Sequence, residues 1–91
     1  MREKAVEARL VKGVKEAGGI CLKLMPVQAG APDRLVFLPG GRFSLIETKA
    51  PSGRVRPVQR VFFARLEALG FPVTILRSSA EVDAWLQREV E

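Results

Sequence analysis

The spacing of apolar residues along the chain predicts three helices. Residues 3–17 form the first, because apolar side chains recur there every three or four positions before a pair of glycines. Residues 57–69 form the second, with a proline in its first turn and Gly70 after its end. The third begins at Ser78–Glu81, which has the spacing of a capping box, and its packing stripe consists of Val82, Trp85, Leu86 and Val90.

Four short apolar runs predict strands. Residues 20–25 form the first, which Pro26 ends, and residues 27–32 follow as a loop. Residues 35–38 and 43–48 predict an antiparallel hairpin around a Pro-Gly-Gly turn. Residues 72–76 are apolar without interruption, which predicts a strand buried on both faces. The order α-β-β-β-α-β-α predicts an α/β fold, with a four-stranded mixed sheet flanked by helices, in a single domain over residues 1–91.

Two residue types exclude whole classes of catalytic site. The sequence contains no histidine and one cysteine, Cys21. These counts therefore exclude an internal disulfide, a zinc site built from Cys and His, and a histidine-dependent triad. Any catalysis must use carboxylates, lysine, hydroxyl groups and a hard metal ion. No run of about 18 apolar residues and no secretory signal is visible, so we expect a cytoplasmic protein.

Glu7 occupies a position that helix packing does not favour. The apolar face of the first helix consists of Leu10, Val11, Val14 and Ala17. Glu7 projects into this stripe, although the opposite face of the helix offers contact with water. Carboxylates are rarely buried unless they are paired or bind a metal. Alternatively, Glu7 reaches water near the start of the helix and interacts favourably with the helix dipole.

The predicted hairpin brings a second group of polar residues together. Pro32-Asp33 opens one strand, and Glu47-Thr48-Lys49 closes the next. Side chains alternate along a strand, so Glu47 and Lys49 point to the same face, and antiparallel pairing brings Asp33 beside them. Two carboxylates suit Mg²⁺, while a lysine can orient the nucleophile and stabilise the transition state. Alternatively, Asp33 caps a turn and the others are rim charges, because both motifs are short and common.

Basic residues suggest an acidic partner. The net charge is +5, and nucleic acid is the commonest partner of such proteins, although a merely basic surface would explain the charge as well. Arg54, Arg56 and Arg60 follow Lys49 in a stretch without acidic residues, and we expect them to contact DNA phosphates unless they form only a solvated face. Lys23 is either a further phosphate contact or a charge that protects an edge strand.

Taken together, these motifs resemble the PD-(D/E)XK nuclease superfamily, and more closely the stand-alone VRR-NUC domains of phages and bacteria. The resemblance covers roughly residues 3–86, and its motifs are Gly30–Val36, Glu47–Pro51 and Gln59, with Glu7 in the first helix. It implies a restriction-endonuclease-like fold and a Mg²⁺-dependent endodeoxyribonuclease in which Mn²⁺ can substitute. It also implies the cytoplasm of a bacterium or of a phage-infected host cell.

The resemblance implies roles for single residues. Asp33 and Glu47 correspond to metal ligands, and Thr48 would lend its backbone carbonyl. Glu7 corresponds to the acid of the N-terminal helix, which completes the metal site directly or through water. Glu3 matches no family position as well as Glu7 does.

Two further residues match catalytic positions of the family. Lys49 corresponds to the catalytic lysine. Gln59 corresponds to the glutamine of the following helix, which supports the lysine or contacts DNA.

The family also implies a branched DNA substrate, such as a four-way (Holliday) junction, and a homodimer, with or without exchanged elements. The broad apolar face of the second helix consists of Val58, Val61, Phe62, Leu66 and Leu69. Phe63 falls among polar residues on the other side, where an exposed phenylalanine would contact a second subunit or DNA bases, or have no role. We expect no neighbouring DNA-binding module of the kind that larger family members have.

Two other functions remain open at this point. A non-catalytic DNA-binding module that keeps the nuclease fold would still bind DNA, but it would not need the three catalytic side chains. A basic structural or interaction domain would show no salt-dependent affinity for DNA.

Overall fold

The computed structural model describes residues 2–25 and 28–90. In chain order its elements are α1 (Glu3–Glu16), β1 (Ile20–Lys23), β2 (Arg34–Leu38), β3 (Arg42–Thr48), α2 (Pro57–Ala68), β4 (Val73–Leu76) and α3 (Ser79–Val90). The order of elements is the predicted one. The first strand ends earlier than predicted, at Lys23. The predicted stop at Pro26 and the start of the next loop at Val27 lie outside the described residues.

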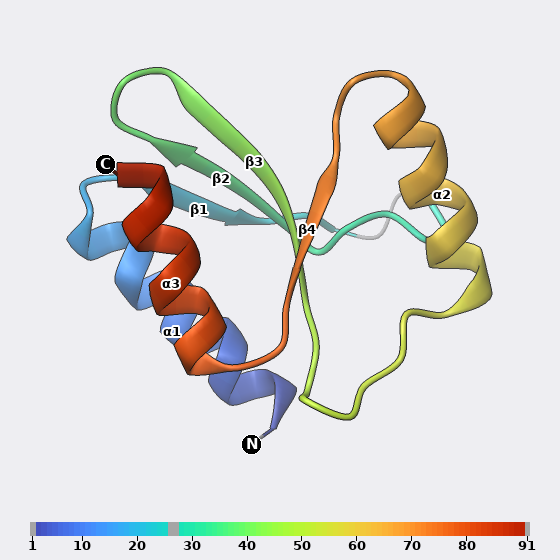
Figure 1. The fold of residues 1–91 in the computed structure, drawn as a ribbon, viewed down its shortest axis with the longest axis horizontal. Helices are drawn as coiled ribbons and strands as arrows, with labels where there is room; N and C mark the ends of the chain where they lie inside the picture. Colours follow the sequence, from blue (N-terminus) through green and yellow to red (C-terminus); the bar gives the residue numbers. More distant parts are fainter. Residues whose placement is uncertain (1, 26–27, 91) are drawn as a thin grey trace.

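The strands form one mixed sheet in the order β1-β2-β3-β4 (Figure 1). The pairs β1–β2 and β2–β3 are antiparallel, whereas β3 and β4 are parallel and α2 makes the crossover between them. Gly40 and Gly41 have φ of +86° and +75°, so the turn between β2 and β3 uses a backbone conformation that favours glycine. The predicted α/β fold with a four-stranded mixed sheet is confirmed.

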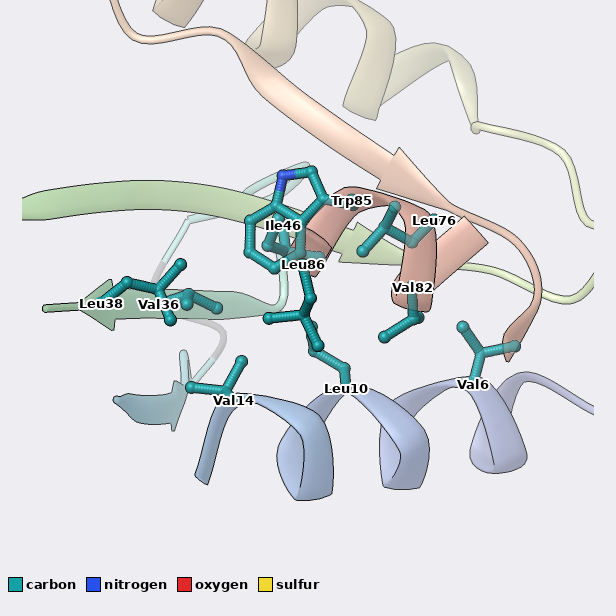
Figure 2. Close-up of a cluster of buried hydrophobic side chains, with 10 residues drawn as sticks. All are labelled: Val6, Leu10, Val14, Val36, Leu38, Ile46, Leu76, Val82, Trp85 and Leu86. Carbon is teal, nitrogen blue, oxygen red and sulfur yellow. The ribbon is translucent and has the colours of Figure 1, made fainter. Parts of the chain in front are cut away.

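Helices α1 and α3 pack together over one face of the sheet, and the hydrophobic core fills the space between them (Figures 1 and 2). The core consists of Val6, Leu10, Val14, Val36, Leu38, Ile46, Leu76, Val82, Trp85 and Leu86. Two predicted core residues lie outside it, because Val11 is 38% and Val90 53% exposed. In α1, Val6 takes the place predicted for Val11, so the buried stripe is rotated toward α3.

The capping box predicted at the start of α3 is present in modified form. The Ser78 hydroxyl accepts a hydrogen bond from the Glu81 backbone N–H at 3.1 Å. The Glu81 carboxylate in turn accepts the backbone N–H of Arg77 at 2.8 Å, one residue before the position of the standard motif. Both bonds satisfy N–H groups at a helix start, so the local signal located this helix correctly.

The second face of the sheet is apolar and largely uncovered. Helix α2 lies on this side and packs near β4, but Gln59 is its one buried residue among those described. The exposed apolar side chains on this side of the molecule are Ile20, Leu22, Phe37, Phe43, Val58, Val61, Leu69 and Phe71. The predicted apolar face of α2 is therefore present, but the chain itself does not bury it.

Two burial predictions on this side of the sheet were wrong. Strand β4 was expected to be buried on both faces, but it is an edge strand in which Val73, Thr74 and Ile75 are only partly buried. Phe63 was expected to be exposed, but it is partly buried and lines a cavity between α2 and β4. Periodicity reports which face of an element is apolar, whereas burial depends on which distant element covers that face. None of the described helices is long and apolar enough to span a bilayer.

Gly30 is the close contact between the loop before β2 and helix α2. Its φ is +87°, and a Cβ atom built on it would lie 2.5 Å from the carbonyl oxygen of Val58. We predict that Gly30→Ala lowers the free energy of unfolding by about 3 kcal/mol, because it combines backbone strain with a steric clash. Urea denaturation measures this change.

Gly41→Ala is the matched control for this substitution. Gly41 also has a positive φ, +75°, but a Cβ atom added to it would meet no other atom within 4 Å. Backbone strain alone is expected to cost about 1 kcal/mol there. Equal losses in the two variants would show that the contact with Val58 is not tight.

Candidate active site

A cavity of about 600 Å³ lies at the end of the sheet where β2 begins and β3 ends. Asp33, Glu47, Lys49 and Gln59, all singled out in the sequence, line this cavity together with Glu3, Lys23 and Arg56. Antiparallel pairing creates the site, because Arg34 lies opposite Ile46 and the residues just beyond this pair meet. Charged groups that are far apart in the sequence therefore share one partly enclosed space.

Asp33 is anchored to the end of β3 by Thr48. The Thr48 hydroxyl donates a hydrogen bond of 2.8 Å to Asp33 Oδ2, and the Thr48 backbone N–H approaches Asp33 Oδ1 at 3.3 Å. The pKa of Asp33 is raised to about 6, mainly by burial; hydrogen bonds from Thr48 oppose this rise, and the charges of Glu47 and Glu7 add to it. A carboxylate in this setting favours a cation.

Glu47, Lys49 and Gln59 form a buried network. Lys49 Nζ lies 3.2 Å from Glu47 Oε2 and donates a hydrogen bond of 3.0 Å to Gln59 Oε1. Gln59 Nε2 donates to the same Glu47 oxygen at 3.0 Å. The side chains of Glu47 and Lys49 are only 6% and 11% exposed, so the three groups hold one another in a fixed arrangement.

Gln59 also joins this network to the start of α2. Its Oε1 accepts the backbone N–H of Arg56 at 2.9 Å, one of the N–H groups that a helix start leaves without an intrahelical partner. The Arg56 N–H can only donate, so it fixes which end of the Gln59 amide is the oxygen. The other end must then face Glu47. One amide side chain thus caps a helix and orients two charged groups.

Glu7 lies beside the cavity rather than on its wall. One oxygen each from Glu3, Glu7 and Asp33 lie within 4.8 Å of one another, and Glu7 Oε2 forms an ion pair of 3.1 Å with Arg34. The sequence had given Glu3 no family role. Its position one helical turn before Glu7 is the signal that could have included it, because residues four apart share a helix face.

The four expected DNA contacts fall into two groups. Lys23 and Arg56 line the site cavity, whereas Arg54 and Arg60 line a second cavity of about 560 Å³ between α2 and β4. Arg77, which the sequence reasoning missed, also lines this second cavity and donates a hydrogen bond to the carbonyl of Gly53. Its position directly after β4 is the sequence feature that could have indicated Arg77.

The site residues fit a divalent metal ion. Glu47 Oε1 is buried and has no hydrogen-bond partner among the described residues. Such an oxygen is costly unless something else binds it. Glu47 and Asp33 line one cavity, and Asp33 also belongs to the group of acids with Glu3 and Glu7, which does not include Glu47. Carboxylates are the protein ligands that Mg²⁺ prefers. Asp33 and Glu47 can supply two ligands, while Lys49 and Gln59 leave Glu47 Oε1 unengaged.

The raised pKa of Asp33 predicts a pH-dependent stability in EDTA. The folded chain holds a proton on Asp33 up to about pH 6, whereas an unfolded aspartate releases it near 3.8. This stabilising contribution is complete below about pH 4 and is lost as pH rises through 6. Wild type should therefore lose stability relative to Asp33→Asn over this range, which thermal denaturation at stepped pH measures. Glu16→Gln controls for the loss of an exposed carboxylate, and a constant difference between wild type and Asp33→Asn would contradict the prediction.

Comparison with known proteins identifies the family. The VRR-NUC domain model matches residues 3–80. A protein described as "Putative nuclease p44", from Acyrthosiphon pisum secondary endosymbiont phage 1, is 44% identical over 79 residues, which are 86% of this chain and 85% of that protein. A solved structure described as "VRR_NUC domain" matches with a TM-score of 0.83 and 29% identity, over 93% of this chain and 94% of the other. The resemblance found in the sequence is thereby confirmed, and the chain belongs to the VRR-NUC family of nuclease domains.

Proposed function

We propose that this nuclease domain hydrolyses phosphodiester bonds in DNA as a Mg²⁺-dependent endonuclease, with residues 1–91 acting as one catalytic domain. The observation that carries the proposal is the unpartnered, buried Glu47 Oε1 in a cavity that also contains Asp33 and Lys49. Mn²⁺ is the expected substitute, because it also accepts oxygen ligands.

The metal ligands in this proposal are Asp33, Glu47 and the backbone carbonyl of Thr48, with Glu7 completing the site directly or through water. When bound, a divalent ion supplies an acidified water and offsets charge on the phosphate. Thr48 holds Asp33 by its hydroxyl and its backbone N–H, so ligand position is set by the end of β3. The proximity of the three acids disfavours their joint ionisation without a cation, which favours metal binding.

The proposed role of Lys49 is to orient the attacking water and to stabilise the charge that develops on the phosphate. Its ammonium group is held by Glu47 and Gln59, so it loses little freedom when the substrate binds. Gln59 acts in this proposal by fixing both partners from α2. In this proposal Lys23 and Arg56, which line the site cavity, contact phosphates next to the cut, and Arg54 and Arg60 contact more distant ones.

A homodimer is the proposed state of the molecule. The exposed apolar side chains on the second face of the sheet and on α2 support it, because soluble proteins rarely expose so many together. Phe37 and Phe43 pack against each other at the sheet with tilted rings, whose centroids are 5.2 Å apart, and are 41% and 45% exposed. A second copy related by a two-fold axis would cover this face and present two sites. Two sites suit cleavage of paired strands in a branched DNA such as a four-way junction.

Lys49→Ala tests the catalytic assignment. We predict a loss of at least about 100-fold in the rate of cleavage with retained DNA binding, because Lys49 acts on the transition state. Linear, flapped and four-way DNA would be incubated with Mg²⁺, Mn²⁺ or EDTA. Lys15→Ala, which removes an exposed lysine near the end of α1, is the matched control.

Three outcomes of this experiment would contradict parts of the proposal. Cleavage in EDTA would contradict the metal requirement, and equal rates on all three DNAs would contradict the preference for branches. Wild type that binds DNA but cleaves none of it would instead support a non-catalytic binding module.

Phe37→Asp tests the dimer. A buried, unpaired carboxylate at the proposed interface should turn a dimer into a monomer, as sedimentation equilibrium at micromolar concentration would show. Val90→Asp is the control, because Val90 is 53% exposed and lies on α3, across the sheet from the proposed interface. A wild type that is already monomeric at this concentration would contradict the proposal.

A further inference from the structure

Arg34 occupies a costly position in the fold. It is the first residue of β2, directly after Asp33, and its side chain is only 13% exposed. Alternation along β2 places it on the same face as Val36 and Leu38, which belong to the hydrophobic core. Charged side chains are rare in such positions unless they are fully paired. An apolar residue would suit this face better if stability alone decided the choice.

The hydrogen bonding of Arg34 is incomplete. One terminal nitrogen donates a hydrogen bond of 3.1 Å to Glu7 Oε2, but Nε is buried and has no partner among the described residues. Arg34 also interacts with the Cys21 thiol: burial raises the pKa of this thiol, and the charge of Arg34 and a side-chain hydrogen bond with it lower the pKa in part. A half-satisfied buried guanidinium contributes little to stability. Its contact with Glu7 is therefore the feature that needs an explanation.

The Arg34–Glu7 ion pair ties α1 to the catalytic end of the sheet. Helix α1 has no side-chain hydrogen bond at its N-cap, residue Arg2. Its other ion pair, Arg9–Asp83 at 2.8 Å, connects it to α3 rather than to the sheet. The pair with Arg34 engages only Glu7 Oε2. It holds the Glu7 carboxylate in a position in which one of its oxygens lies within 4.8 Å of oxygens from Glu3 and Asp33.

We propose that Arg34 is a positioning residue of the metal site, which acts by holding the carboxylate of Glu7 toward Asp33. The inference rests on the proposed metal-dependent function. The sign of the effect on metal affinity distinguishes this role from a purely electrostatic one. A nearby positive charge repels a metal ion, so loss of that charge alone would strengthen metal binding. Loss of a positioning contact would weaken it.

A double-mutant cycle measured by Mn²⁺ binding tests the proposal without DNA or turnover. Isothermal titration calorimetry would compare wild type, Arg34→Met, Glu7→Gln and the double variant. Methionine keeps an apolar chain in the buried position and removes only the guanidinium. We expect each single variant to bind Mn²⁺ about tenfold more weakly, as is typical when a ligand loses its outer support. The double variant should bind no more weakly than Glu7→Gln, because Arg34 acts through Glu7.

Arg9→Met is the matched control, because it removes an arginine and an ion pair from α1 without contact to Glu7. It should leave Mn²⁺ affinity within about twofold of wild type. Arg34→Lys should restore part of the affinity, because an ammonium can still pair with Glu7 but lacks the planar fork. Thermal denaturation of every variant in EDTA would separate folding losses from losses of metal affinity.

The possible results separate the two proposals. Unchanged or tighter Mn²⁺ binding by Arg34→Met, beside a wild type that binds, would overturn the positioning role alone. A double variant that binds Mn²⁺ tenfold more weakly than Glu7→Gln would also overturn the positioning role, since Arg34 would then act independently of Glu7. A folded wild type that binds no Mn²⁺ would overturn the positioning role together with the proposed metal-dependent function.

Discussion

The antiparallel register of β2 against β3 is the constraint on which the rest of the site depends. Arg34 pairs with Ile46, so Asp33 reaches Thr48, which lies 15 positions later in the sequence. A shift of one residue would turn every side chain of β3 to the opposite face. Glu47 would then point toward the hydrophobic core and Ile46 away from it. The same hydrophobic burial that holds the sheet under α1 and α3 therefore also places the Glu47 carboxylate at the candidate site.

Charge balance around the cavity follows from this geometry. Glu47 is compensated by Lys49 and Glu7 by Arg34, with ion pairs of 3.2 and 3.1 Å. Asp33 has hydrogen bonds from Thr48 but no ion pair among the described residues, and its pKa rises to about 6. The site thus keeps one acid without a cationic partner and one oxygen of Glu47 without a hydrogen bond. Both features are unfavourable without a cation, and the proposed divalent ion would make them favourable.

Helix α2 connects catalysis to the uncovered face of the sheet. Its attachment to the rest of the chain depends on the Gln59 hydrogen bonds and on the close approach of Gly30 to Val58. The apolar surface that α2 shares with the sheet is largely exposed. The helix that orients Lys49 is therefore also the helix that a second subunit would contact.

Local patterns in the sequence were sufficient to predict the helices and strands, the fold class and the family. Apolar periodicity, glycine turns and the capping signal at Ser78 depend on neighbours in the sequence, so all the helices and strands were predicted with small errors at their ends. The motifs around Asp33, Glu47 and Lys49 were short, but their order along the chain indicated a VRR-NUC domain, which the family match confirms. Which role each residue plays in catalysis stays a prediction.

Burial and partner choice were decided only by the tertiary structure. Val11 and Val90 fit an apolar pattern but lie outside the core, and β4 is an edge strand despite its continuous apolar run. The pairing of Arg34 with Glu7 had no local signal that could predict it. The sequence by itself determined which elements form and which chemical groups are available. Only the packing of distant elements determined which groups meet, because each contact depends on two segments whose relative position neither one encodes alone.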